Sequence, residues 1–315
     1  MVAELLAYIQ SDHFNEAIVE EPFCSCTSLT EDDVLEEIVT KQLNTVDKVR
    51  SELKWSGEGC DACSNALHYY LRMIYKQESW SYSIEQLGGV KHQSDGRYSI
   101  TMPLKGALLK ESYLQDVLGL MKEYNQSKVV LTEDQRLMLV NVEKSNVRPI
   151  MERLKIERKP KSEFWIHKAR TSIGGSIQQA YVEDINHIAT ELDEAIDTIF
   201  APQHVFINVT ANYNIGVNEE KELKLIRMSR GWEMYVSDQL IAVVEQEEAA
   251  LLTITFLQYY RETAKYLEDL YSWLNRLGII HIREVIFSTE LRDQLIAALK
   301  VDLHQYMNIE NQAIN

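Results

Sequence analysis

The sequence predicts an α+β protein in which a small all-helical module is followed by a mixed region with a helical C-terminus. Three observations support this class. All four cysteines lie between residues 24 and 63, in a segment whose apolar residues repeat at helical spacing. From Arg97 the apolar residues alternate, as they do in half-buried strands. From Glu247 onward the apolar spacing is helical again.

Length, composition and charge limit the number of domains and the kinds of partner that this protein can have. A chain of 315 residues is long enough for roughly two or three domains. The net charge of −16 argues against nucleic acid or an anionic membrane as a partner. No segment approaches the roughly 18 apolar residues of a membrane span. Clustered thiols and a start without a basic n-region predict a cytoplasmic protein.

Residues 1–20 are the first element. Val2–Ile9 has the pattern of a short amphipathic helix, and a polar connector follows it as far as Pro22. Two interpretations stay open. The segment could be an ordinary N-terminal helix, or the closing helix of a preceding cysteine module, in which case the chain is a fragment of a longer protein.

Residues 21–80 are predicted to form the all-helical cysteine module. Thr30 opens a helix with a capping-box pattern, and Thr45 is placed to cap a second one. A third helix starts at the second cysteine pair and runs to Ile74. Both cysteine pairs then lie in loops or at helix starts, where free N–H groups stabilise thiolates.

The next predicted domain, residues 88–158, alternates strands and helices in the order β-α-β-β-α. This order is typical of a split, ferredoxin-like α+β unit. Its elements are a strand over Tyr98–Leu104, a helix over Lys110–Tyr124, strands over Lys128–Leu131 and Leu137–Val142, and a helix over Val147–Leu154.

Residues 160–315 are predicted to form the last domain. A helix is expected over Gln178–Ile199, and the chain is expected to be helical from Glu247. A helix over Tyr266–Arg276 should end at Gly278, which is suited to the C′ position. The predicted strands are His204–Val209, Leu223–Met228 and Trp232–Val236.

The cysteines carry the clearest chemistry in the chain. Cys24 and Cys26 form a C-x-C pair, and Cys60 and Cys63 form a C-x2-C pair after 33 intervening residues. Four thiolates at one site suit a [2Fe-2S] cluster or a structural zinc ion, and the spacing alone does not separate them. No cysteine is left for a disulfide, a nucleophile or a second thiolate-bound cluster.

The residues around the cysteines distinguish these options. The string CSCTSLTEDDVLEEIVTKQLNTVDKVRSELKWSGEGCDACSNALHYYL resembles the bacterioferritin-associated-ferredoxin-like [2Fe-2S] module. That family has a C-x-C pair, a capped helix, a second helix and a final C-x2-C pair. The resemblance implies that Cys24, Cys26, Cys60 and Cys63 are the ligands of one [2Fe-2S] cluster.

The following segment, DGRYSITMPLKGALLKESYLQDVLGLMKEYNQSKVVLTEDQRLMLVNVEKSNVRPIMERL, resembles the ferredoxin-like half-domain of nitrite and sulfite reductases. The strongest local matches are Asp95-Gly96, Thr132 and Gln135-Arg136. Further on, GWEMYV and FLQYYRETAKYLEDLYSWLNRLGIIHIREVI resemble the C-terminal region of the NAD(P)H nitrite reductase large-subunit family. In that family an FAD/NAD(P)H reductase half precedes the cysteine module. The resemblance therefore implies such a flavoprotein as an upstream or separate partner.

The sequence departs from this family where cofactors should bind. Sirohaem reductases hold a [4Fe-4S] cluster with C-x5-C and C-x3-C. The corresponding positions here are Ser172, Gln178, Asn212 and Gly216, which do not replace thiolates. We therefore expect neither sirohaem nor [4Fe-4S], and a degenerate reductase-like domain. Arg136, at a position that looks anion-binding in the family, is expected to be structural or to lie on the surface.

These features predict an electron-transfer protein without a complete catalytic site, forming part of an oxidoreductase. The combination resembles the electron-transfer subunits of assimilatory nitrate reductases. This resemblance implies a partner chain carrying the molybdenum catalytic subunit, with the sirohaem-like region as a docking scaffold. Two alternatives stay open: a fragment of an NAD(P)H nitrite reductase, and a zinc-binding module that acts only in interactions.

Overall fold

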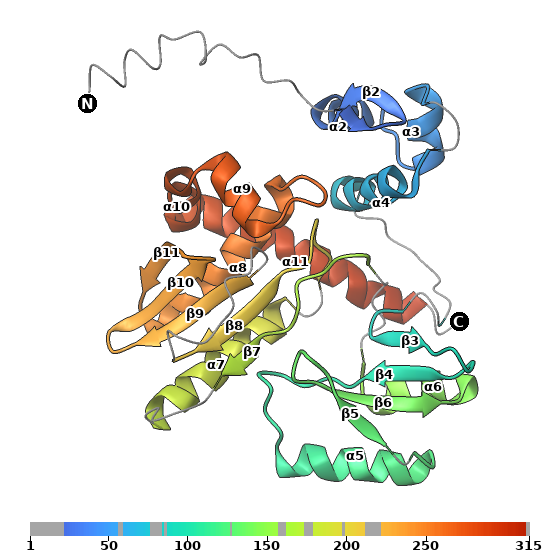
Figure 1. Ribbon diagram of the computed structural model, residues 1–315, viewed down its shortest axis with the longest axis vertical. Coiled ribbons are helices and arrows are strands. Elements are labelled where there is room, and N and C mark those ends of the chain that lie inside the picture. Colours follow the sequence, from blue (N-terminus) through green and yellow to red (C-terminus); the bar gives the residue numbers. More distant parts are fainter. Residues whose placement is uncertain are drawn as a thin grey trace. The chain divides into compact units, whose positions relative to one another are not determined.

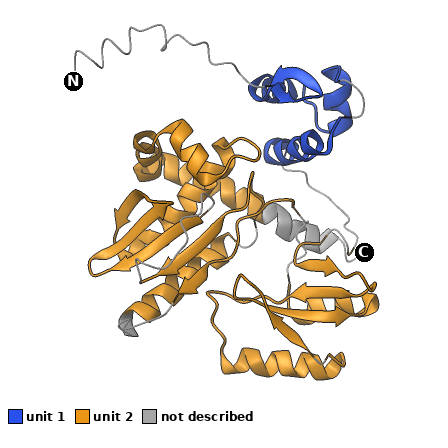
Figure 2. Ribbon diagram, viewed as in Figure 1, with its two compact units in different colours: residues 1–75 blue, residues 76–315 orange. Residues whose placement is uncertain are grey.

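The chain divides into two compact units, Met1–Tyr75 and Lys76–Asn315 (Figure 2). The computed structural model describes residues 22–55, 59–75, 84, 87–126, 128–156, 162–172, 179–196, 199–211 and 222–312. The helix expected over Val2–Ile9, and nearly all of the connector after it, lie outside the described residues. The mixture of helices and sheets confirms the predicted α+β class.

The first unit contains helices and one short antiparallel strand pair (Figure 1). The three predicted helices are present, but the module is not all-helical as expected. The chain reverses at the first cysteine pair, and backbone groups across this reversal pair Pro22 with Thr30 and Cys24 with Thr27. Strands this short have too few residues to show a period. The elements are β1 (Pro22–Cys24), β2 (Thr27–Thr30), α2 (Glu31–Thr40), α3 (Val46–Glu52) and α4 (Asp61–Tyr75).

The predicted helix caps fix where two of these helices begin. The Thr30 hydroxyl accepts a hydrogen bond from the backbone N–H of Asp33 at 3.1 Å, and the Asp33 carboxylate accepts one from the N–H of Thr30 at 3.0 Å. Thr45 caps α3 by accepting from the N–H of Lys48. Each such cap contributes about 1 kcal/mol to helix stability. The core beneath is formed by the following buried side chains: Val34, Ile38, Leu43, Val46, Val49, Trp55, Cys63, Leu67 and Leu71.

The second unit begins with a four-stranded antiparallel sheet in the order β3-β4-β6-β5. Strand β3, only three residues long, was not predicted. The other elements follow the predicted order, although the strand that starts at Tyr98 ends at Thr101 rather than at Leu104. The elements are β3 (Val90–His92), β4 (Tyr98–Thr101), α5 (Glu111–Glu123), β5 (Val129–Leu131), β6 (Leu137–Val142) and α6 (Lys144–Arg153).

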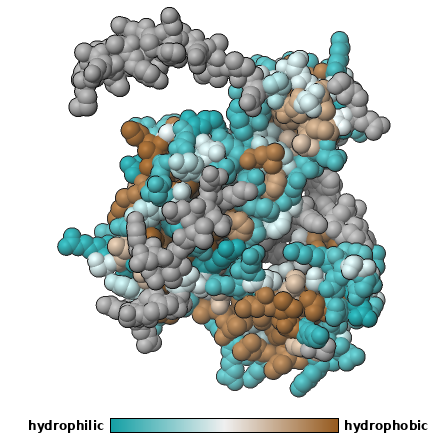
Figure 3. All heavy atoms as spheres, viewed as in Figure 1, coloured by the Kyte–Doolittle hydropathy of each residue, from teal (hydrophilic) through white to brown (hydrophobic). Residues whose placement is uncertain are grey.

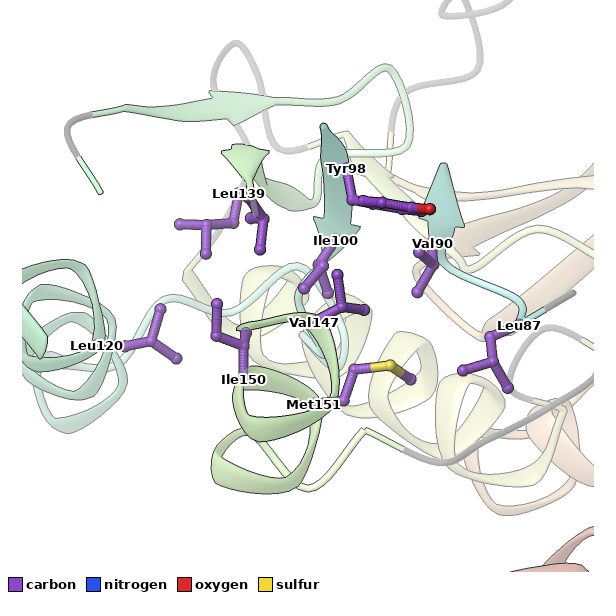
Figure 4. Close-up of a cluster of buried hydrophobic side chains, with 10 residues drawn as sticks. Leu87, Val90, Tyr98, Ile100, Leu120, Leu139, Val147, Ile150 and Met151 are labelled. Atoms are coloured by element: carbon purple, nitrogen blue, oxygen red, sulfur yellow. The ribbon is translucent and has the colours of Figure 1, made fainter. Parts of the chain in front are cut away.

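This sheet has its own hydrophobic core (Figure 4). Ile100 and Leu139 of the sheet pack with Val147 and Ile150 of α6, and all four are fully buried. Other apolar side chains stay outside the core, and on the face shown in Figure 3 they gather over α5 and β5. These exposed side chains include Leu114, Leu118, Val130 and Leu131.

The rest of the second unit is built on a five-stranded mixed sheet in the order β11-β10-β9-β8-β7. Strands β7, β8 and β9 run parallel, whereas β9, β10 and β11 are antiparallel. Strands β7 and β11 were not predicted. Strand β11 follows β10 through a two-residue turn, in which Ser237 has a φ of 53°. The elements are β7 (Arg170–Ser172), α7 (Gln179–Ala195), β8 (Phe206–Thr210), β9 (Glu222–Met228), β10 (Gly231–Val236) and β11 (Gln239–Val244).

Helices form the C-terminal part, as predicted. The helix expected from Tyr266 begins only at Leu270, because the Asp269 carboxylate caps it by accepting from the N–H of Ser272 at 2.8 Å. It ends at Gly278, which has a φ of 83°. No helix in the described part of the chain is long and apolar enough to span a bilayer. The helices are α8 (Gln246–Thr263), α9 (Leu270–Leu277), α10 (Ile279–Phe287) and α11 (Thr289–Gln312).

Candidate metal centre

The first unit brings all four cysteines together. The Sγ atoms of Cys24, Cys26, Cys60 and Cys63 all lie within 4.8 Å of one another. Cys63 is buried in the core of the unit, and the other three are half-buried. Residues that are distant in sequence therefore form one compact set of thiols.

Two local structures position the cysteine pairs. Cys24 is the last residue of β1, and Cys26 lies in the turn that leads to β2, where its N–H donates to Cys24 Sγ at 3.3 Å. Cys60 immediately precedes α4, and its carbonyl accepts from the N–H of Ser64 at 3.0 Å. Cys63 lies in the first turn of the same helix. The second pair lies at a helix start, as expected, whereas the first pair lies in a hairpin that was not expected.

The helix start favours the thiolate form of Cys60. The N–H of Cys63 donates to Cys60 Sγ at 3.5 Å, and the N–H of Cys60 donates to Cys63 Sγ at 3.2 Å. The hydrogen bonds from Cys63, first from its backbone and then from its side chain, lower the pKa of Cys60 to about 7. A thiolate is the form of cysteine that binds metal.

Burial has the opposite effect on two other thiols. It raises the pKa of Cys24 to about 12, and it raises the pKa of Cys63 as well. For Cys63 this effect of burial is larger than the lowering caused by the hydrogen bonds from the Cys60 backbone and the Arg50 side chain. Without a metal, the raised pKa values favour the protonated form of both groups. A metal ion reverses this preference, because its own charge deprotonates a coordinating thiol.

Sequence reasoning missed one residue at this site. Arg50 of α3 places its Nη2 atom 3.9 Å from Cys63 Sγ. Nothing in the local pattern predicted this approach, because it depends on how α3 packs against α4.

The thiols fit the chemistry of the cofactor that the sequence predicted. Four cysteine sulfurs at one site suit either a [2Fe-2S] cluster or a zinc ion, and their spacing does not separate the two. The chain has no other cysteine.

The positions expected to lack [4Fe-4S] ligands are described only in part. Ser172 ends β7, and its carbonyl accepts from the Thr210 hydroxyl at 3.3 Å. Gln178, Asn212 and Gly216 lie outside the described residues.

Arg136 was expected either to have a structural role or to lie on the surface, and it has a structural role. Its side chain is 2% exposed, and Nη2 lies 2.7 Å from the Asp193 carboxylate and 3.2 Å from the carbonyl oxygen of Ala169. The guanidinium therefore faces protein groups rather than an open site.

Two known domain families match consecutive parts of the chain. Residues 22–73 match the BFD-like [2Fe-2S] binding domain, and residues 90–155 match the nitrite/sulfite reductase ferredoxin-like half domain. The chain thus has, in this order, segments similar to a [2Fe-2S]-binding domain and to a reductase half-domain, which confirms the predicted resemblance.

Two of its relatives are named for nitrite or nitrate reduction. The chain is 29% identical to Nitrite reductase [NAD(P)H] of Bacillus subtilis (strain 168) over 94% of its own length and 39% of that protein. It is 27% identical to the Assimilatory nitrate reductase electron transfer subunit of the same organism, over 98% of its own length and 40% of that protein. The chain thus spans about two fifths of either relative.

A solved structure, that of the NirA protein of Mycobacterium tuberculosis, has partial similarity. The TM-score is 0.47 at 14% identity, over 67% of this chain and 43% of the other.

Proposed function

We propose that this protein transfers electrons through a [2Fe-2S] cluster held by Cys24, Cys26, Cys60 and Cys63. The convergence of the four Sγ atoms within 4.8 Å, inside the segment that matches a [2Fe-2S]-binding domain, carries this proposal. When bound, a [2Fe-2S] cluster supplies reversible exchange of one electron. The protein supplies the thiolates, the N–H groups at the start of α4 and a half-buried site that limits access of water.

The proposed partners rest on the family resemblance of the sequence, and the relatives' names support only a link to NAD(P)H and to nitrate reductase. The donor would be an FAD/NAD(P)H flavoprotein, either on a preceding segment of a longer protein or on a separate chain. The acceptor would be the molybdenum catalytic subunit of a nitrate reductase, as the similarity to an assimilatory nitrate reductase electron transfer subunit suggests. Four closely placed thiols that must stay reduced favour the cytoplasm.

In this proposal the second unit, from Lys76, is a docking scaffold without sirohaem or [4Fe-4S]. Two observations support this role. All cysteines of the chain lie in the first unit, so thiolates for a second cluster are lacking. Arg136 forms a buried ion pair with Asp193, so its guanidinium does not face an anionic substrate. The division of this unit into domains 88–158 and 160–315 is part of the same proposal.

A second candidate is a fragment of a nitrite reductase, favoured by the 29% identity to an NAD(P)H nitrite reductase. The cysteine count and the burial of Arg136 weigh against it.

Analysis of anaerobically purified protein tests the cofactor. A [2Fe-2S] centre predicts iron and acid-labile sulfide in equal amounts, and visible absorption that bleaches on reduction. Each Cys→Ser change at positions 24, 26, 60 and 63 should remove this absorption, whereas Ser25→Ala, at an exposed position between two of the cysteines, should keep it. Stoichiometric zinc after reconstitution with iron and sulfide would contradict the proposal and favour a zinc-binding interaction module.

A further inference from the structure

Among the described residues, the Arg50 guanidinium contacts one of the four thiols. Arg50 of α3 donates from Nη2 to Cys63 Sγ over 3.9 Å, within reach of an N–H···S contact. This is the side-chain hydrogen bond that Arg50 makes among the described residues. Helix α3 is thereby linked to the first turn of α4, where the second cysteine pair lies.

The backbone before Cys60 is shaped to receive this guanidinium. Gly59 has a φ of +78°, a conformation that residues with a Cβ rarely adopt. A Cβ atom built on Gly59 would lie 2.6 Å from Arg50 Nη2 and 2.8 Å from its Cζ and Nε atoms. The missing side chain therefore leaves the space that the guanidinium fills.

The guanidinium has a further buried donor. Arg50 Nε is buried and has no hydrogen-bond partner among the described residues. A buried donor without an acceptor is costly, and an ionised group more so. The sulfurs of an iron–sulfur cluster accept such hydrogen bonds, and these contacts, with the net charge, set the cluster's reduction potential.

We propose that Arg50 is a positioning residue that raises the reduction potential of the [2Fe-2S] cluster by holding a positive charge against Cys63. This inference rests on the proposed cluster site. Reduction adds one negative charge at the site, and a nearby cation stabilises that charge. In a half-buried environment the attraction is screened less than in water. Gly59 assists by leaving room for the guanidinium.

The test is a potentiometric titration of the cluster, followed by electron paramagnetic resonance of the reduced state. Arg50→Gln removes the charge and should lower the potential. Arg50→Lys keeps the charge without the forked donors and should lower it less. Gly59→Ala keeps Arg50 but displaces its guanidinium, and should also lower the potential.

Lys48→Gln is the matched control. It changes the net charge by the same amount in the same helix, but Lys48 is exposed and its ammonium donates to Asn44 instead. Its potential should equal that of the wild type. An unchanged potential in Arg50→Gln, or an equal shift in Lys48→Gln, would overturn the role of Arg50.

Iron and sulfide contents distinguish a failure of the proposed cluster from a failure of the proposed role of Arg50. Wild-type protein without a cluster would refute the proposed function itself, and the inference with it. A wild type with a cluster, alongside Arg50→Gln, Arg50→Lys and Gly59→Ala that all fail to assemble one, would show that Arg50 serves assembly. That result would overturn its role in setting the potential.

Discussion

Arg136 and Asp193 form a buried ion pair that joins the two parts of the second unit. Arg136 leads into β6 of the four-stranded sheet, whereas Asp193 lies on α7 beside the five-stranded sheet, and both side chains are at most 2% exposed. The Asp193 carboxylate also accepts from the N–H groups of Ala169 and Gly106, each at 2.8 Å. This carboxylate is therefore fully committed to structure.

The neighbouring residues of the β5–β6 turn make the same connection. The Gln135 side chain donates to the carbonyl oxygen of Thr171 at 2.9 Å and accepts from its N–H at 2.8 Å, so it pairs with β7 as another strand would. The Asp134 carboxylate contacts His167 at 2.9 Å and Arg170 at 3.0 Å. Three consecutive residues thus hold the four-stranded sheet to the rest of the unit.

Removing one member of the buried pair should be strongly destabilising. Arg136→Met leaves the Asp193 carboxylate buried without its cation, which typically costs about 3–5 kcal/mol. Adding Asp193→Leu removes the unpaired charge but leaves the N–H groups of Ala169 and Gly106 without their acceptor, so it should recover only part of this loss. Urea unfolding followed by circular dichroism measures both changes.

The control for this prediction is Arg97→Met. Arg97 is half-exposed beside Glu143, and surface pairs contribute at most about 1 kcal/mol. A cost for Arg136→Met no larger than that of Arg97→Met would show that the buried pair does not hold the unit together.

The lowered pKa of Asp134 should make the stability of the second unit depend on pH in acid. Burial alone would raise its pKa, but the hydrogen bond and charge of His167, together with those of Arg170, hold the pKa at about 2. A carboxyl whose pKa is depressed in the folded state stabilises the fold above its unfolded pKa, about 3.9. This contribution, about 2 kcal/mol, is lost as the pH falls from about 4 through 2.

The measurement is the free energy of unfolding of the wild type and of Asp134→Asn between pH 6 and pH 2. The wild type should be the more stable above pH 4, and the difference should shrink toward pH 2. The same difference at every pH would mean that the carboxylate charge is not what Asp134 contributes.

The cysteine module should depend on its cofactor more than the second unit does. A domain of this size has a small core, and Cys63, 1% exposed, is part of it. Cys60→Ser should therefore increase hydrogen exchange across residues 24–75 while leaving residues after Arg97 largely unchanged. Ser25→Ala should alter neither region. A cooperative loss of protection in both regions would contradict the division into two units.

Local chemistry made several elements predictable from the sequence. The capping box at Thr30 and the glycine at position 278 act within a few residues of themselves, so the pattern contains the whole interaction. Longer periodic helices, such as α5 and α7, were found for the same reason. The strands β3 and β7 were missed because each has only three residues and is defined by pairing, β3 with the next strand and β7 with a strand 38 residues away. Length is not the whole reason, since β5 is as short and was predicted, whereas the six-residue β11 was not.

In the candidate site, too, the residues with a local sequence pattern were predicted, and those that depend on tertiary packing were not. The cysteines were found because they are few and their spacing is informative. Arg50 was not found, because its approach to Cys63 and Gly59 depends on the packing of α3 against α4. The role of the Gln135-Arg136 motif also needed the structure, since Thr171 and Asp193 lie 36 and 57 residues away in sequence.

The last prediction is that this protein does not reduce nitrite or sulfite by itself. In sirohaem reductases the protein must hold both the macrocycle and a coupled cluster, and must place cationic groups around the anion. The thiolates for a second cluster are lacking, because every cysteine belongs to the set at 24, 26, 60 and 63. Arg136 could face an anion only by leaving Asp193 unpaired in the interior, at a cost of several kcal/mol.

The assay is nitrite consumption with reduced viologen, after reconstitution with sirohaem, iron and sulfide. We expect no turnover above that of free sirohaem, in the wild type and in Cys24→Ser alike. Because Cys24→Ser removes a proposed ligand of the first unit alone, it separates turnover at that unit from turnover at the second. Turnover that persists in this variant would place a reductase centre in the second unit and overturn its role as a scaffold.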